Sequence, residues 1–177
     1  QLGDVTSISA ALGVSLNDVG GAIAQMTVNG NNTAKTITML KSMLSELSKE
    51  GQMAADNFEK LSGQSFTEFI ANGGTLQEAM IKMEEYAKKS NKSVVDLFSS
   101  VEAGRAALNL TGINAENFAN KLEKVASSSG ELETAYRTAT DNIQSEWEKL
   151  VMAMDNRWSK FVKSVVENES LLNSPEL

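Results

Sequence analysis

Apolar residues recur at spacings of three and four along most of the chain. Three sets show this spacing: Leu16, Val19, Ile23 and Met26; Ile37, Leu40, Leu44 and Leu47; and Leu76, Met80, Met83 and Ala87. Because a helical turn takes about 3.6 residues, each set lies on one helix face. Short β-branched runs such as Val94-Val95 sit inside helical stripes and lack flanking turn residues, so they are poor strand candidates. The pattern therefore predicts an all-α protein, a multi-helix array.

Capping residues mark where these helices begin and end. Residues able to accept a hydrogen bond from a free backbone amide precede five segments: Ser15, Asn32, Thr75, Ser93 and Asn114. Thr75 is followed three residues later by Glu78, which fits a capping box. Glycines that could close a helix in the left-handed conformation follow the segments: Gly30, Gly51, Gly63, Gly112 and Gly130. Together these signals predict helices near 3–12, 15–28, 33–50, 53–62, 75–90, 93–110, 115–128 and 131–168.

Two segments depart from this regular pattern. Gly20-Gly21 interrupts the predicted helix 15–28, which indicates either a kink or a close contact with another helix. The segment 63–74 places Phe66, Phe69 and Ile70 between glycines, and we expect it to form a turn-bounded hydrophobic plug.

The last segment has an unusually long apolar stripe. Between Glu131 and Ser174 there is neither Gly nor Pro. The stripe runs through Leu132, Tyr136, Ala139, Ile143, Trp147, Leu150, Met154, Trp158, Phe161 and Val165. Its mean spacing of about 3.67 is that of an eleven-residue repeat, which favours a straight or slightly right-handed helix. We therefore divide the chain into a glycine-punctuated helical module, 1–130, and a long helix, 131–174, that serves as an assembly seam.

This seam is the predicted oligomer interface. A helix of that length would span on the order of 60 Å, which is more than a small domain needs to cover its own core. We expect the centre of the interface to consist of five large side chains: Trp147, Leu150, Met154, Trp158 and Phe161. Packing within the seam remains the simpler interpretation of the two tryptophans.

Composition narrows the possible chemistry. The 177 residues include no Cys and no His, which excludes Cys- or His-based zinc sites, cysteine nucleophiles and Ser-His-Asp triads. The carboxylate pairs Glu84-Glu85 and Glu146-Glu148 do not converge on one point of a helix surface. We predict no enzyme activity, no cofactor and no metal site. The net charge is −7 without a basic lobe, so direct nucleic-acid binding is not expected.

The residue string itself resembles a known family. The stretch VVDLFSSVEAGRAALNLTG, residues 94–112, is followed by NAENFANKLEKVASSSGELETAYRTATDNIQSEWEKLVMAMDN, residues 114–156. Together they resemble the conserved core region of phage tail tape measure proteins. An upstream stretch, ALGVSLNDVGGAIAQMTVNGNNTAKTITMLKSMLSEL, residues 11–47, resembles the paired-helix unit of that family. The resemblance covers roughly residues 5 to 156.

The resemblance implies a structural protein of a phage or prophage tail that sets tail length and takes part in tail assembly and DNA ejection. The implied partners are copies of itself, tail tube and tail tip or distal tail proteins, and tail assembly chaperones. Host membrane contact would fall to parts of the parent protein outside this chain. The implied location is the virion tail, in the tube lumen or at the tip, and the host cytoplasm during assembly.

Other interpretations remain open at this stage. The chain begins with Gln1 and has no basic-then-apolar leader, so we expect a piece of a longer protein. Glycines break residues 1–130 into short helices, which favours a folded or tip-anchoring module over a length-setting rod. The main alternative is a helical adaptor or signalling interaction module without catalytic activity. A membrane-active helical protein and an enzyme rank below it.

Overall fold

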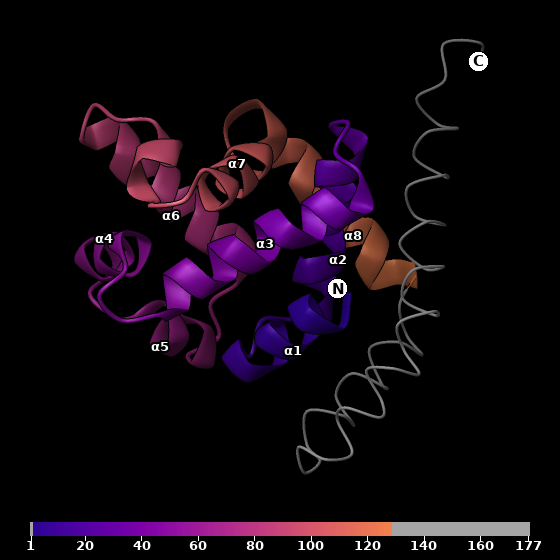
Figure 1. The fold of residues 1–177 in the computed structure, drawn as a ribbon, viewed down its shortest axis with the longest axis horizontal. Coiled ribbons are helices and arrows are strands. Elements are labelled where there is room, and N and C mark those ends of the chain that lie inside the picture. The colour runs from indigo at the N-terminus through magenta and orange to yellow at the C-terminus, as the bar shows by residue number, and fades with distance from the viewer. Residues whose placement is uncertain (1, 129–177) are drawn as a thin grey trace.

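A computed structural model describes residues 2–128, and these residues form a bundle of short helices without any strand (Figure 1). The α-helices are α1 (Leu2–Leu12), α2 (Leu16–Val28), α3 (Thr33–Ser48), α4 (Met53–Ser62), α5 (Phe66–Ala71), α6 (Leu76–Lys89), α7 (Val101–Leu110) and α8 (Ala115–Ser128). Two 3-10 turns, η1 (Val94–Leu97) and η2 (Gly112–Asn114), flank α7. The all-α prediction is confirmed for this part of the chain. The predicted long helix 131–174 lies outside the described residues.

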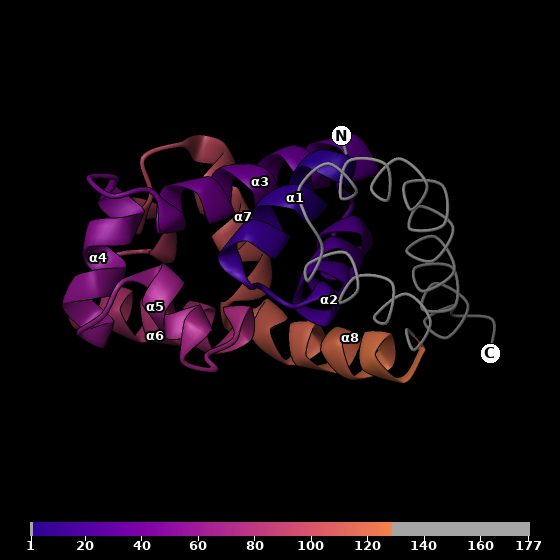
Figure 2. The same cartoon turned by 90° about the horizontal axis from the view of Figure 1, so that it is seen from below.

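Helix α3 lies at the centre of the arrangement. It contacts α1, α2, α4, α5 and α7, and Figure 1 shows it crossing the middle of the molecule between α7 and the α1–α5 side. Seen from below, α8 runs along the outside next to α2 (Figure 2). The helix pair α2–α8 and the pair α3–α7 are the two most extensive helix contacts, so segments far apart in sequence hold the bundle together.

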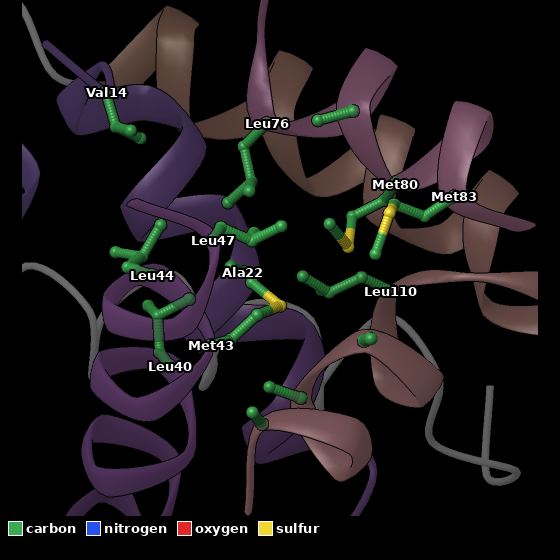
Figure 3. Close-up of a cluster of buried hydrophobic side chains, with 14 of the residues drawn as sticks. Val14, Ala22, Leu40, Met43, Leu44, Leu47, Leu76, Met80, Met83 and Leu110 are labelled. Carbon is green, nitrogen blue, oxygen red and sulfur yellow. The ribbon is translucent and has the colours of Figure 1, made fainter. Parts of the chain in front are cut away.

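One continuous core fills the space between these helices. It includes buried apolar side chains from every described α-helix. In Figure 3, Met43 and Leu47 of α3, Met80 and Met83 of α6, and Leu110 of α7 converge on one region. Five methionines are buried and form part of this core, namely Met26, Met39, Met43, Met80 and Met83.

Most of the predicted caps are present. Ser15 accepts from the amide of Asp18 at 3.0 Å and Asn32 accepts from the amide of Lys35 at 2.8 Å. Thr75 and Glu78 form the predicted capping box at the start of α6. The predicted stops at Gly30, Gly51, Gly63 and Gly112 all have a positive φ, whereas Gly130 lies outside the described residues.

Three local predictions need correction. The predicted helix 93–110 is broken, because the chain is extended at Phe98 and Ser100 between η1 and α7. The segment 63–74 contains the short helix α5, which the sequence interpretation described only as a plug, although Phe66, Phe69 and Ile70 are buried as expected. Asn114 does not cap α8 but lies within η2.

Candidate interaction surface

The predicted oligomer interface, Trp147, Leu150, Met154, Trp158 and Phe161, lies outside the described residues. The site that the structure offers is therefore built from other parts of the chain. It comprises an open pocket beside α3, two buried carboxylates, an amide cluster and a set of exposed apolar side chains.

The open pocket lies between α1 and α3 and has a volume of ≈ 540 Å³. Its lining consists of Asp4, Ile37, Thr38, Lys41, Ser42, Ser45, Glu46 and Ser100. Lys41 Nζ lies 3.4 Å from Asp4 Oδ2, and both side chains are more than half exposed, so this ion pair adds little stability. The pocket is hydroxyl-rich and holds both signs of charge, which suits a polar partner surface better than a catalytic centre.

Glu46 anchors one end of this pocket. Its two carboxylate oxygens accept hydrogen bonds from the backbone amides of Ser99 and Ser100, each at 2.8 Å. The side chain of Ser100 in turn caps α7 by accepting from the amide of Ala103 at 3.2 Å. The negative charge of Glu46 thus sits at the positive end of the α7 dipole. It also satisfies the two amides exposed by the break before α7.

Asp18 plays the same part for α6. The carboxylate of this buried residue of α2 accepts from the amide of Leu76, the first residue of α6, at 3.0 Å. Burial raises the pKa of Asp18 above its ordinary value. Hydrogen bonds to Leu76 and Ser15 oppose this rise in pKa, and the nearby charge of Glu78 adds to it.

Sequence reasoning missed both carboxylates, although a signal existed for each. Glu46 follows Met39 by seven residues and Met43 by three, which places it on the buried face of α3. Asp18 lies in a helix that is buried on nearly every side. An acidic residue at such a position must have a hydrogen-bond partner.

An amide cluster joins the ends of α2 and α7. Asn29 Nδ2 donates to Asn109 Oδ1 at 2.9 Å, and Gln25 Nε2 donates over longer distances to Asn29 Oδ1 at 3.5 Å and Asn114 Oδ1 at 3.4 Å. Asn114 is held here through its contact with Gln25 and through donation from its Nδ2 to the carbonyl of Leu108 at 3.3 Å. This engagement is the physical reason why it does not serve as a helix cap.

Three exposed apolar side chains lie on α7 and just after it. Val101 and Leu108 are seven residues apart, so they lie on the same face of α7, and they are 58% and 50% exposed. Ile113 in η2 is 93% exposed. Such side chains favour contact with another protein surface.

The candidate catalytic pair Glu84-Glu85 has no common target. Glu84 forms an ion pair with Lys88 at 3.1 Å, one helical turn away, whereas Glu85 is exposed. Within residues 2–128, no group of acidic side chains is arranged to hold a metal ion. In the same part of the chain, no helix is both long and apolar enough to cross a membrane.

Comparison with curated proteins identifies a phage relative. The chain is 36% identical over 151 residues to a protein of Clostridium phage phiCD119 named Probable tape measure protein. The aligned region takes up 82% of this chain. The chain belongs to the phage tape measure protein family. The resemblance inferred from residues 11–47, 94–112 and 114–156 is thereby confirmed.

The tape measure relative is much longer than this chain, which spans 16% of the relative's length. No protein-family model matches the chain. No solved structure matches it either.

Proposed function

We propose that the chain is a structural segment of a phage tail tape measure protein, without catalytic activity. The observation that carries this proposal is the 36% identity to the tape measure relative over 82% of the chain. The absence of Cys and His from all 177 residues supports a non-catalytic role, because it removes the side chains used most often for nucleophilic and zinc-dependent chemistry.

Within the tape measure protein, residues 2–128 act as a folded module and not as the length-setting rod. A single extended helix has no interior, whereas these residues share one core that draws on every described α-helix. Two buried carboxylates, Asp18 and Glu46, further tie together helices that are far apart in sequence. Hydrogen bonds between such distant segments favour a compact folded unit, which would occupy one position in the tail and would not extend along it.

The partners and location follow from the same proposal. The open pocket beside α3 and the exposed side chains Val101, Leu108 and Ile113 offer surfaces for tail tube, tail tip or distal tail proteins, or for another copy of the chain. Tail assembly chaperones would hold the protein in the host cytoplasm before it enters the tail. Roles in setting tail length and in DNA ejection belong to the full-length protein.

An in-frame deletion of residues 2–128 in the gene for the full-length protein distinguishes a folded module from a length-setting rod. As a continuous helix these residues would span about 190 Å at about 1.5 Å per residue, so deletion from a rod should shorten the tail by that length. A folded module predicts loss of complete tails or of infectivity without proportionate shortening. Electron microscopy of tails, with mass spectrometry of purified virions for peptides of this chain, gives the answer.

Two point variants of the full-length protein, one buried and one exposed, test whether the folded state of this module is required. Leu44 is fully buried, so Leu44→Asp should unfold the module and reproduce the deletion phenotype. The exposed residue Lys82 on α6 serves as the control, and Lys82→Ala should leave tails and infectivity unchanged. Normal virions that contain no peptide of this chain would refute the proposal. Tails shortened by the full helical length would refute the module.

A further inference from the structure

Two Asn-Gly pairs in the chain have nearly the same local backbone. Asn29-Gly30 follows α2 and Asn72-Gly73 follows α5. The φ and ψ angles are −74° and 11° at Asn29, and −84° and 11° at Asn72. In both pairs the glycine has a left-handed φ, 89° at Gly30 and 94° at Gly73, and its amide donates at 3.0 Å to a carbonyl three residues earlier.

This sequence is chemically reactive because glycine has no side chain to shield its amide nitrogen. After losing its proton, that nitrogen can attack Cγ of the preceding asparagine. The new N–Cγ bond closes a five-membered succinimide, and Nδ2 leaves as ammonia. Water then opens the ring at either carbonyl, giving aspartate or isoaspartate. The glycine must first leave its hydrogen bond, so the rate depends on local opening.

The two asparagines differ in how the structure holds them. Asn29 Nδ2 donates at 2.9 Å to Asn109 Oδ1 on α7, a residue 80 positions away. Its Oδ1 accepts from the buried side chain of Gln25. The helix that Asn29 terminates, α2, has ten of its 13 residues buried. Both hydrogen bonds, at Asn29 and at Asn72, lie at the surface, but only the one at Asn29 links two helices that are far apart in the sequence.

Within residues 2–128, the hydrogen bonds of Asn72 go only to residues close to it in the sequence. Its Nδ2 donates at 2.9 Å to Oε1 of Gln64, a contact made at the surface. The helix that it terminates, α5, has only six residues. A Cβ placed on Gly73 would meet nothing within 4 Å, and the same is true of Gly30, so the two sites differ in their asparagine contacts and not in the space around the glycine. Fraying the last turn of this short helix does not involve the contact between α2 and α7.

We propose that Asn72 is a site of spontaneous deamidation and that the hydrogen bond to Asn109 protects Asn29 from the same reaction. Isoaspartate at position 72 would add one atom to the main chain shortly before α6. It would thereby disturb the segment that sets Thr75 as the helix cap and Leu76 as the donor to Asp18. The consequence is a chemical change that loosens the α5–α6 connection while α2 keeps its attachment to α7.

The test incubates the 177-residue chain at mildly alkaline pH, folded and in concentrated urea, and follows conversion at each asparagine. Trypsin releases Asn72 in peptide 61–82 and Asn29 in peptide 1–35, and fragmentation assigns the altered residue. In urea the two sites should react at similar rates, because both are Asn-Gly pairs and the glycine that follows the asparagine dominates the intrinsic rate. In the folded chain Asn72 should react at least about fivefold faster than Asn29, the factor given by about 1 kcal/mol of opening free energy.

Two variants of Asn109 distinguish the effect of its hydrogen bond to Asn29 from an effect of overall stability. Asn109→Ala removes the acceptor and should raise conversion at Asn29 severalfold, whereas Asn109→Asp keeps an acceptor and should leave Asn29 protected. Cooperative urea unfolding of each variant confirms that it is folded. Equal or reversed rates at the two sites in the folded chain would overturn the proposal. So would an unmodified Asn72 after a time in which the unfolded chain reacts completely.

Discussion

Gly21 of α2 lies directly against Leu122 of α8. A Cβ built on Gly21 would stand 2.7 Å from Leu122 Cδ2 and 3.3 Å from Leu122 Cα. The backbone distance matters more, because a side-chain methyl group can rotate away but a helix axis must shift. The Gly20-Gly21 pair therefore marks a close contact between helices, which was one of the two interpretations of that sequence.

Gly21→Ala should destabilise the chain by about 1 to 2 kcal/mol. Overpacking costs about 1 to 3 kcal/mol, and the higher helix propensity of Ala returns somewhat under 1 kcal/mol of that cost. Urea unfolding measures the change. In a double-mutant cycle with Leu122→Ala, the two losses should add to more than the loss in the double variant, because the shorter side chain makes room. Strict additivity would mean that the two residues do not compete for space.

Asp18→Asn should change how stability depends on pH. Burial raises the pKa of Asp18 in the folded chain, so folding favours the protonated carboxyl. The stabilisation from protonating Asp18 is complete below the pKa of the unfolded chain and is lost as pH rises through the folded-state pKa. The amide oxygen of Asn can still accept from Leu76, so the variant should gain stability relative to wild type as pH rises through that range.

Urea midpoints of wild type and Asp18→Asn across a pH series give this comparison. Asp18→Ala is the control, because it leaves the Leu76 amide without an acceptor; relative to Asp18→Asn it should cost about 1 to 3 kcal/mol at every pH, since neither variant titrates at this position. Parallel pH profiles for wild type and the Asp18→Asn variant would show that the carboxyl does not titrate differently on folding.

Glu46→Gln should destabilise the chain by about 1 to 3 kcal/mol, although it removes no carbon atoms. The carboxylate accepts from both Ser99 and Ser100, whereas an amide presents one acceptor and directs its NH₂ group at the other donor. Glu50→Gln, at an exposed position just after the end of α3, should be neutral within about 0.5 kcal/mol. Equal midpoints for Glu46→Gln and Glu50→Gln would contradict the bidentate arrangement.

Asn91 is the one non-glycine residue with a positive φ, 55°, among residues 2–128. Asn tolerates this left-handed conformation better than other side chains do, and Gly tolerates it best. Asn91→Ala should therefore cost about 1 kcal/mol, while Asn91→Gly should leave stability nearly unchanged or raise it slightly. Thermal unfolding of the three chains would reveal whether this order holds.

The seam in the last segment remains a prediction for residues outside the described range. Trp158→Ala should weaken self-association, because a large aromatic at the centre of an interface often contributes about 2 kcal/mol or more. Sedimentation of wild type and variant over a wide concentration range measures the effect, with helicity followed in parallel. A wild-type chain that stays monomeric at high concentration would contradict self-assembly through Trp147, Leu150, Met154, Trp158 and Phe161.

Local chemistry in the sequence was sufficient to predict most helices. Side-chain oxygens at Ser15, Asn32 and Thr75 cap amides three residues away, and both groups belong to the same short segment. The capping box at Ser65 and Glu68 follows the same rule and was visible in the sequence, yet it was overlooked. The short helix α5 was missed for that reason.

Tertiary structure decided the features whose partners lie far away in the chain. The break before α7 persists because Glu46, 53 residues from Ser99, satisfies the freed amides. Phe66 and Phe69 pack edge-on against Phe58 with ring centroids 5.6 and 5.2 Å apart, which fixes where α5 lies against α4. Helical periodicity can predict that such residues are buried, but it cannot predict which distant residue they contact. Those pairings depend on packing the whole bundle at once.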